Sequence, residues 1–171
     1  MSDQPVSIWK STMQSGAVIA MLMIIFLLIT YIGGLITNKA LSYVSYLILF
    51  GGMYWGMKTY RTQSGGYISY GKAFQSGVLI SLFGGIIISF ATYILYMLDP
   101  GLSETMLQEA ENTLLENGIS EDMVEMQMDM VRKMMTPMML FWMGLLGYLL
   151  LGLVFSAIAA IFVKKEADPF A

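Results

Sequence analysis

Four long stretches without a single charged side chain decide what this chain can become. They cover residues 11–38, 40–57, 73–98 and 134–163. A helix that crosses a bilayer needs about 20 largely apolar residues in a row. We therefore expect an all-α integral membrane protein that forms one domain over residues 1–171. Its four transmembrane helices should lie at about 12–37, 41–60, 73–98 and 137–163.

The composition supports this class and removes most chemistry. Hydrophobic residues make up 57% of the chain and charged residues 12%, whereas an ordinary soluble domain has roughly 25% charged residues. Cysteine and histidine are both absent, so thiol nucleophiles, the commonest general base and the commonest transition-metal ligand are missing. The four stretches also lack the ionisable groups on which ion-coupled transporters usually rely. We expect no enzymatic activity, no cofactor and no metal.

The distribution of basic residues predicts the orientation. Lys and Arg are enriched in cytoplasmic loops of membrane proteins. Segment 58–72 carries three basic residues and no acidic one. With both termini in the cytoplasm, six of the nine basic residues lie inside. We therefore expect a multi-pass protein of the cell inner membrane with both termini cytoplasmic. No basic surface suited to nucleic acid is present.

The same segment is the expected contact surface of the cytoplasmic loop. Tyrosine rings suit the headgroup level of the bilayer, and each Lys or Arg near an anionic leaflet contributes on the order of 1 kcal/mol. Anchoring at the lipid surface is the simpler interpretation, and docking of a cytoplasmic partner is the alternative. The residues concerned are Lys58, Arg61, Tyr67, Tyr70 and Lys72.

The segment between the third and fourth stretches differs in kind. Nine of the twelve acidic residues lie between positions 99 and 129. Pro100 and Gly101 should end the third span, Ser103 and Ser120 should cap two further helices, and Gly118 should separate them. We expect an extracytoplasmic, acidic, amphipathic helical hairpin over 102–135.

Methionines are frequent in and after this hairpin. Thioethers suit Cu(I), but methionine also fills irregular apolar gaps. Alternating positions such as Met126 and Met128 point in very different directions on a helix, so the filling role is the favoured interpretation. Cu(I) binding is the alternative.

Small residues recur every fourth position in the third and fourth stretches. In lipid, helices associate by close packing over such residues, because water does not drive them together. We expect these rows to pack within one chain, with an interface between two copies as the alternative. If the two helices run antiparallel, the rows meet at matching depths. The rows hold Gly77, Ser81, Gly85, Ser89, Gly144, Gly152, Ser156 and Ala160.

The sequence at 60–77, YRTQSGGYISYGKAFQSG, resembles the signature of a bacterial membrane-protein family named domain of unknown function 4199. The matching positions are Gly66, Tyr67, Ile68, Ser69, Tyr70, Gly71, Ala73 and Phe74. The resemblance implies four membrane helices with an acidic hairpin before the last one, over nearly the whole chain. It implies no activity.

These observations favour a small, non-enzymatic, structural or accessory protein of the inner membrane. Its partners would be the lipid bilayer and either a second copy of the chain or another membrane protein. The alternative is a channel-forming or accessory subunit of a transport system. A pore should place Ser81, Ser89, Thr92 or Gln75 on a water-lined surface, whereas an accessory protein should bury them or turn them towards lipid.

Overall fold

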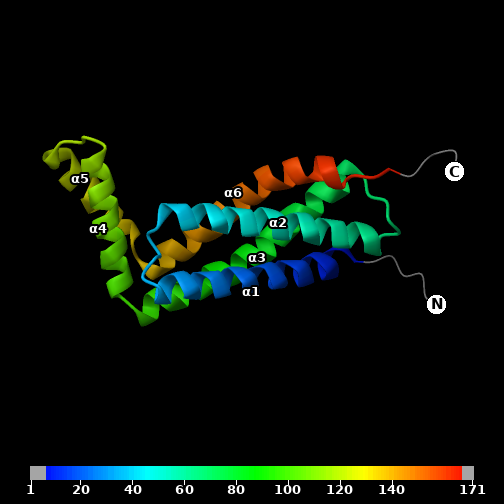
Figure 1. The fold of residues 1–171 in the computed structure, drawn as a ribbon, viewed down its shortest axis with the longest axis horizontal. Coiled ribbons are helices and arrows are strands. Elements are labelled where there is room, and N and C mark those ends of the chain that lie inside the picture. The colour runs from blue at the N-terminus through cyan, green and yellow to red at the C-terminus, as the bar shows by residue number, and fades with distance from the viewer. Residues whose placement is uncertain (1–6, 167–171) are drawn as a thin grey trace. The chain divides into compact units, whose positions relative to one another are not determined.

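The computed structural model describes residues 7–166, which form six α-helices (Figure 1). The chain divides into two compact units. The bundle unit comprises Met1–Ile88 and Leu145–Ala171, and the hairpin unit comprises Ser89–Gly144. The prediction of a single domain concerns independent folding and stays a prediction. The helices are α1 (Ile8–Ile32), α2 (Lys39–Gln63), α3 (Tyr70–Leu98), α4 (Gly101–Glu116), α5 (Glu121–Met134) and α6 (Pro137–Val163).

Three helices of the described chain, α1, α3 and α6, are long and apolar enough to cross a membrane. This confirms an all-helical chain with membrane-like helices. Helix α2 is as long as α1, at 25 residues. However, serine, tyrosine and glycine lower the hydropathy of its apolar stretch, and Lys39, Lys58 and Arg61 lie near its ends. Length and composition alone therefore make α2 no candidate span.

The first helix begins and ends earlier in the chain than the predicted 12–37, since α1 runs from Ile8 to Ile32. It ends at Ile32, because Gly33 and Gly34 follow and Gly34 adopts a φ of 65° that glycine tolerates best. A short link then leads to Asn38, whose side chain accepts hydrogen bonds from the backbone N–H groups of Ala40 and Leu41, at 2.9 and 3.3 Å. This cap fixes the start of α2.

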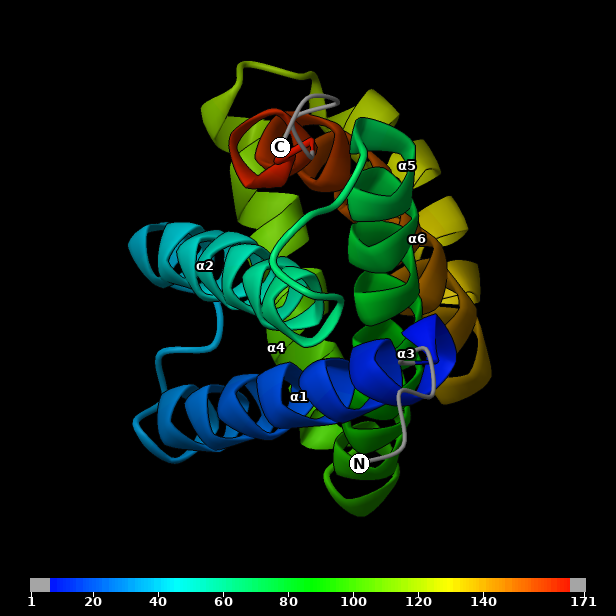
Figure 2. The ribbon, with the colours of Figure 1, turned by 90° about the vertical axis from the view of Figure 1, so that its right-hand side faces the viewer.

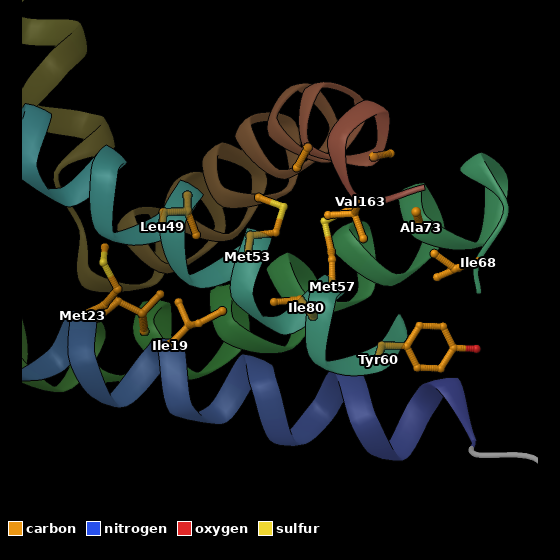
Figure 3. Packing of buried hydrophobic residues seen from close by; sticks show 13 residues of the cluster. Ile19, Met23, Leu49, Met53, Met57, Tyr60, Ile68, Ala73, Ile80 and Val163 are labelled. Carbon is orange, nitrogen blue, oxygen red and sulfur yellow. The ribbon is translucent and has the colours of Figure 1, made fainter. Parts of the chain in front are cut away.

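The bundle unit has a continuous apolar core. Figure 3 shows Ile19 of α1, Met53 and Met57 of α2 and Ile80 of α3 gathered between the helices. All four side chains are at most 2% exposed. Helices α1 and α2 follow each other as neighbours in the chain and pack together, as both ribbon views show (Figures 1 and 2).

The hairpin unit contains α4 and α5, which pack on each other. Gly118, with a φ of 75°, makes the turn between them. The predicted cap at Ser103 is wrong: α4 already begins at Gly101, whose N–H donates to an Asp99 carboxylate oxygen at 3.1 Å. Ser120 stands at the start of α5, but its hydroxyl makes no capping hydrogen bond.

Candidate functional site

Helices α3 and α6 meet along a seam of small residues. A methyl group added at Gly77 would lie 2.5 Å from the Ser156 hydroxyl oxygen. One added at Gly152 would collide with Ser81, and one at Gly85 would lie 2.9 Å from the Cβ atom of a tyrosine on α6, Tyr148. Each step of four residues along α3 is thus matched by a step of four back along α6. The two helices are antiparallel and in close contact, and none of the three glycines leaves room for a side chain.

The seam hydroxyls are used inside the bundle unit. Ser81 donates to the backbone carbonyl of Tyr148 at 2.6 Å, and Ser156 donates to the sulfur of Met53 at 3.1 Å. Ser81 is 1% exposed and Ser156 is fully buried. These two hydroxyls therefore join helices to each other and face no open space. Ala160, further along the same row, is also fully buried.

The hairpin unit holds one more pair of this kind. A methyl group at Gly144 would lie 3.2 Å from the hydroxyl oxygen of Ser89. Ser89 is only 2% exposed, and its hydroxyl has no hydrogen-bond partner among residues 7–166. The sequence pattern placed all eight small residues on two helices, and the structure sets members of one row against members of the other.

Close approach between helices also occurs where no row of fours predicts it. A methyl group at Gly16 of α1 would lie 2.9 Å from the carbonyl oxygen of Ile80, and one at Gly84 would lie 3.2 Å from that of Gly16. Helix α1 therefore crosses α3 backbone to backbone. On α2, a methyl group at Gly52 would lie 2.7 Å from Ile19. Gly16 and Gly84 have no glycine four positions away, whereas Gly52 is followed four positions later by Gly56, where an added methyl group would lie 2.8 Å from Ser15.

The five residues predicted to form the loop's contact surface lie at or near a second feature, a junction between the α2–α3 loop and the end of α6. Ile68 and Lys165 form an antiparallel β-bridge, with backbone N–O distances of 2.8 and 2.9 Å. Gly65 and Gly66 precede it with φ values of 83° and 86°. Only glycine adopts these values without strain, so the signature glycines turn the loop towards α6.

Side chains strengthen this junction. The Arg61 guanidinium donates to the carbonyl oxygen of Val163 at 3.0 Å, where the end of α6 leaves carbonyl groups without helical partners. The Tyr70 hydroxyl donates to the carbonyl of Ala157 at 3.3 Å. The Lys165 ammonium lies 5.4 Å from the centre of the Tyr67 ring, a cation–π geometry.

Of the five predicted loop residues, Arg61, Tyr67 and Tyr70 thus contact the chain itself. Lys58 and Lys72 are exposed. The partners Val163 and Lys165 did not follow from the sequence, because no local pattern marks a bridge between a loop and a distant helix end.

The methionines of α5 also separate as the helical period requires. Met128 is 3% exposed, whereas Met126 and Met130 are 66% and 67% exposed. These side chains do not converge on one point. No cluster of acidic side chains that could hold a metal ion occurs in the described part of the chain, which has no His or Cys.

Comparison with known proteins agrees with the signature loop. A family model described as protein of unknown function (DUF4199) matches residues 14–165. No curated protein and no solved structure matches the chain. The match covers the seam, the hairpin and the junction, and the chain belongs to the DUF4199 family.

Proposed function

We propose that this chain is a small, non-enzymatic protein of the bacterial inner membrane with a structural or accessory role. It crosses the bilayer four times, with both termini cytoplasmic, and acts through its rigid helix packing and through contacts with another membrane component. Residues 1–6 and 167–171, the termini themselves, lie outside the described residues.

Helix α2 supplies the fourth span in this proposal. Its stretch 40–57 contains no charged residue, and its Met53 and Met57 are fully buried in the core of the bundle unit. Lys58, one residue beyond that stretch, is exposed and can extend its ammonium towards water. The hydroxyls of Ser45 and Thr59 donate to carbonyl oxygens within α2 itself, at 3.4 and 3.0 Å. A helix with this core contact and these ends supports a span better than a surface position.

The observation that carries the accessory role is the burial of the seam hydroxyls. A pore within the chain needs polar groups on a water-lined surface. Ser81 and Ser89 are instead at most 2% exposed and lie in contacts between helices. Thr92 is half-buried, and of the four polar residues that a pore would expose, Gln75 alone is exposed. This arrangement favours a packed bundle over a transport pathway.

Two measurements test the role together. Photo-crosslinking side chains placed at the exposed Lys72 and Glu125 of the full chain, in its native membranes, should yield discrete adducts with one membrane protein or with a second copy. The buried Val163 position is the matched control and should yield none. Purified chain in liposomes should give ion flux no greater than empty liposomes. Flux above that background, with no protein adduct at either exposed position, would replace the accessory role with a channel.

A further inference from the structure

Helix α5 carries an apolar stripe that nothing in the described chain covers. Met126 and Met130 are 66% and 67% exposed, and Met123 and Met134, at 51% and 39%, extend the same row. The spacings of three, four and four place these residues on one face of the helix. Val124 and Met128 lie on a second face and are 4% and 3% exposed. The exposed stripe is therefore not the face that packs on α4.

The second face is already occupied. Val124 and Met128 share a groove of about 420 Å³ with Leu115 of α4. A third face carries Asp122, Glu125 and Asp129, which are all exposed. Helix α5 thus has three faces, of which one contacts α4, one is acidic, and one is apolar and uncovered.

The chain itself indicates what covers the exposed apolar stripe of α5. Helix α5 ends at Met134, and α6, which is long and apolar enough to cross a membrane, begins at Pro137. Only two residues separate them, so the last turn of α5 lies where α6 enters the bilayer. Exposed apolar side chains recur along the chain from Met134 to Met138 and Trp142 at the start of α6. The stripe therefore leads directly into the exposed apolar surface of a candidate membrane span.

Charge and length agree with the same occupant. The last turn of α5 carries Arg132 and Lys133, which can contact lipid phosphates. Lys133 follows Asp129 by four positions and so lies on the acidic face, which leaves the apolar stripe itself without charge. A helix of 14 residues is about 21 Å long at 1.5 Å per residue, too short to cross the hydrocarbon core. An amphipathic helix can lie in the interface with its apolar face among the acyl chains.

We propose that α5 lies at the lipid–water interface on the outer side of the membrane that α6 crosses. There it inserts its stripe of Met123, Met126, Met130 and Met134 into the lipid, as an anchor at the start of α6. This role is separate from the accessory function, since insertion requires only that α6 crosses the membrane, and the placement on the outer side rests on the proposed orientation. The surface faces lipid, and the acidic face stays in water.

Spin labels can test the position of each face. The chain has no cysteine, so Met126→Cys and Met130→Cys each give one labelling site in the otherwise unchanged full chain. In vesicles of phosphatidylcholine with some phosphatidylglycerol, labels at both sites should collide several-fold more with oxygen, which dissolves in lipid, than with a water-soluble nickel chelate. Labels at Glu125→Cys and Asp129→Cys, the matched controls, should show the reverse preference.

A second variant separates insertion from folding. Met126→Asp with Met130→Asp changes two side chains that point away from α4, so helix content measured by circular dichroism should stay the same. A label at Met123→Cys should then lose its oxygen preference, whereas Glu125→Gln with Asp129→Asn should leave it intact. Nickel access at positions 126 and 130 equal to that at 129 would overturn the proposal. Exclusion of both reagents, with spin–spin broadening, would also overturn it and put a second copy on the stripe.

Discussion

The α3–α6 seam of the bundle unit and the α4–α5 contact of the hairpin unit are built from opposite kinds of residue. Helices α3 and α6 approach where side chains are missing, at Gly77 and Gly152. Helices α4 and α5 pack where apolar side chains are present, at Val124 and Met128. In lipid there is no hydrophobic force between helices, so steric fit decides, whereas a helix pair outside the hydrocarbon gains from removing apolar surface from water. The difference is the one that the proposed placement requires, with the bundle unit in lipid and the hairpin unit outside the hydrocarbon.

Sidedness is the sharpest way to break this comparison. We expect cysteines at Ser64 and Asn117, both exposed, to react with a membrane-impermeant maleimide from opposite sides. Asn117→Cys should label on intact cells, and Ser64→Cys only after the membrane is opened, because the basic loop stays inside. The effect is all or none. Labelling of both from one side would end the four-span proposal, while Gly71→Cys, exposed in the first turn of α3 just after the same loop, controls for accessibility.

The next largest effect is expected at the seam. Gly152→Leu forces a side chain into Ser81 and should lower the free energy of unfolding in detergent by about 3 kcal/mol, the upper range for overpacking. Gly147→Leu is the matched control on the same helix, because nothing lies within 4 Å of the position that its Cβ would take. An unfolding titration of both variants in mixed micelles measures the difference. Equal stability would refute the role of the seam, and loss of a dimer with an intact monomer would move the seam to an interface between copies.

A smaller loss of stability is expected in the hairpin unit, where a side chain is removed and not added. Met128→Ala removes a buried side chain and should destabilise the contact between α4 and α5 by about 2 kcal/mol. Met126→Ala, two positions away on the exposed stripe, should change it by less than about 0.5 kcal/mol. Hydrogen exchange of the α5 amides compares them. Similar exchange rates in the two variants would mean that the hairpin is not held by its buried face.

The features that followed from the sequence are those with a local period. The stretches without charge gave the helices, and the spacing of four gave the register between α3 and α6, because both are properties of one helix at a time. The crossing at Gly16 and Gly84 has no such period, since each glycine is needed by a partner on another helix. The start of α4 differs from the prediction because the helix already begins at Gly101, whose N–H donates to the Asp99 carboxylate, two positions before Ser103.

The loop residues show a further limit. Their types predict a surface that contacts lipid or a protein partner, and that choice left out the chain itself. The bridge between Ile68 and Lys165 joins two irregular segments, and pairing over such a distance leaves no pattern in either one. Tyr67 and Tyr70 remain exposed although the backbone of the loop turns inward to α6, so the anchoring role at the lipid surface stays a prediction.

The junction has a consequence for the order in which the molecule is made. Arg61 and Val163 are 102 positions apart, and the chain is synthesised from its N-terminus. The loop after α2 is complete long before α6 emerges, so Arg61, Tyr67 and Ile68 wait without their partners while α3, the hairpin and α6 are inserted. The bridge to Ile68 can form only after Lys165 has been made and α6 runs back along α3. In the four-span arrangement proposed above, the junction therefore closes after the last helix has been inserted.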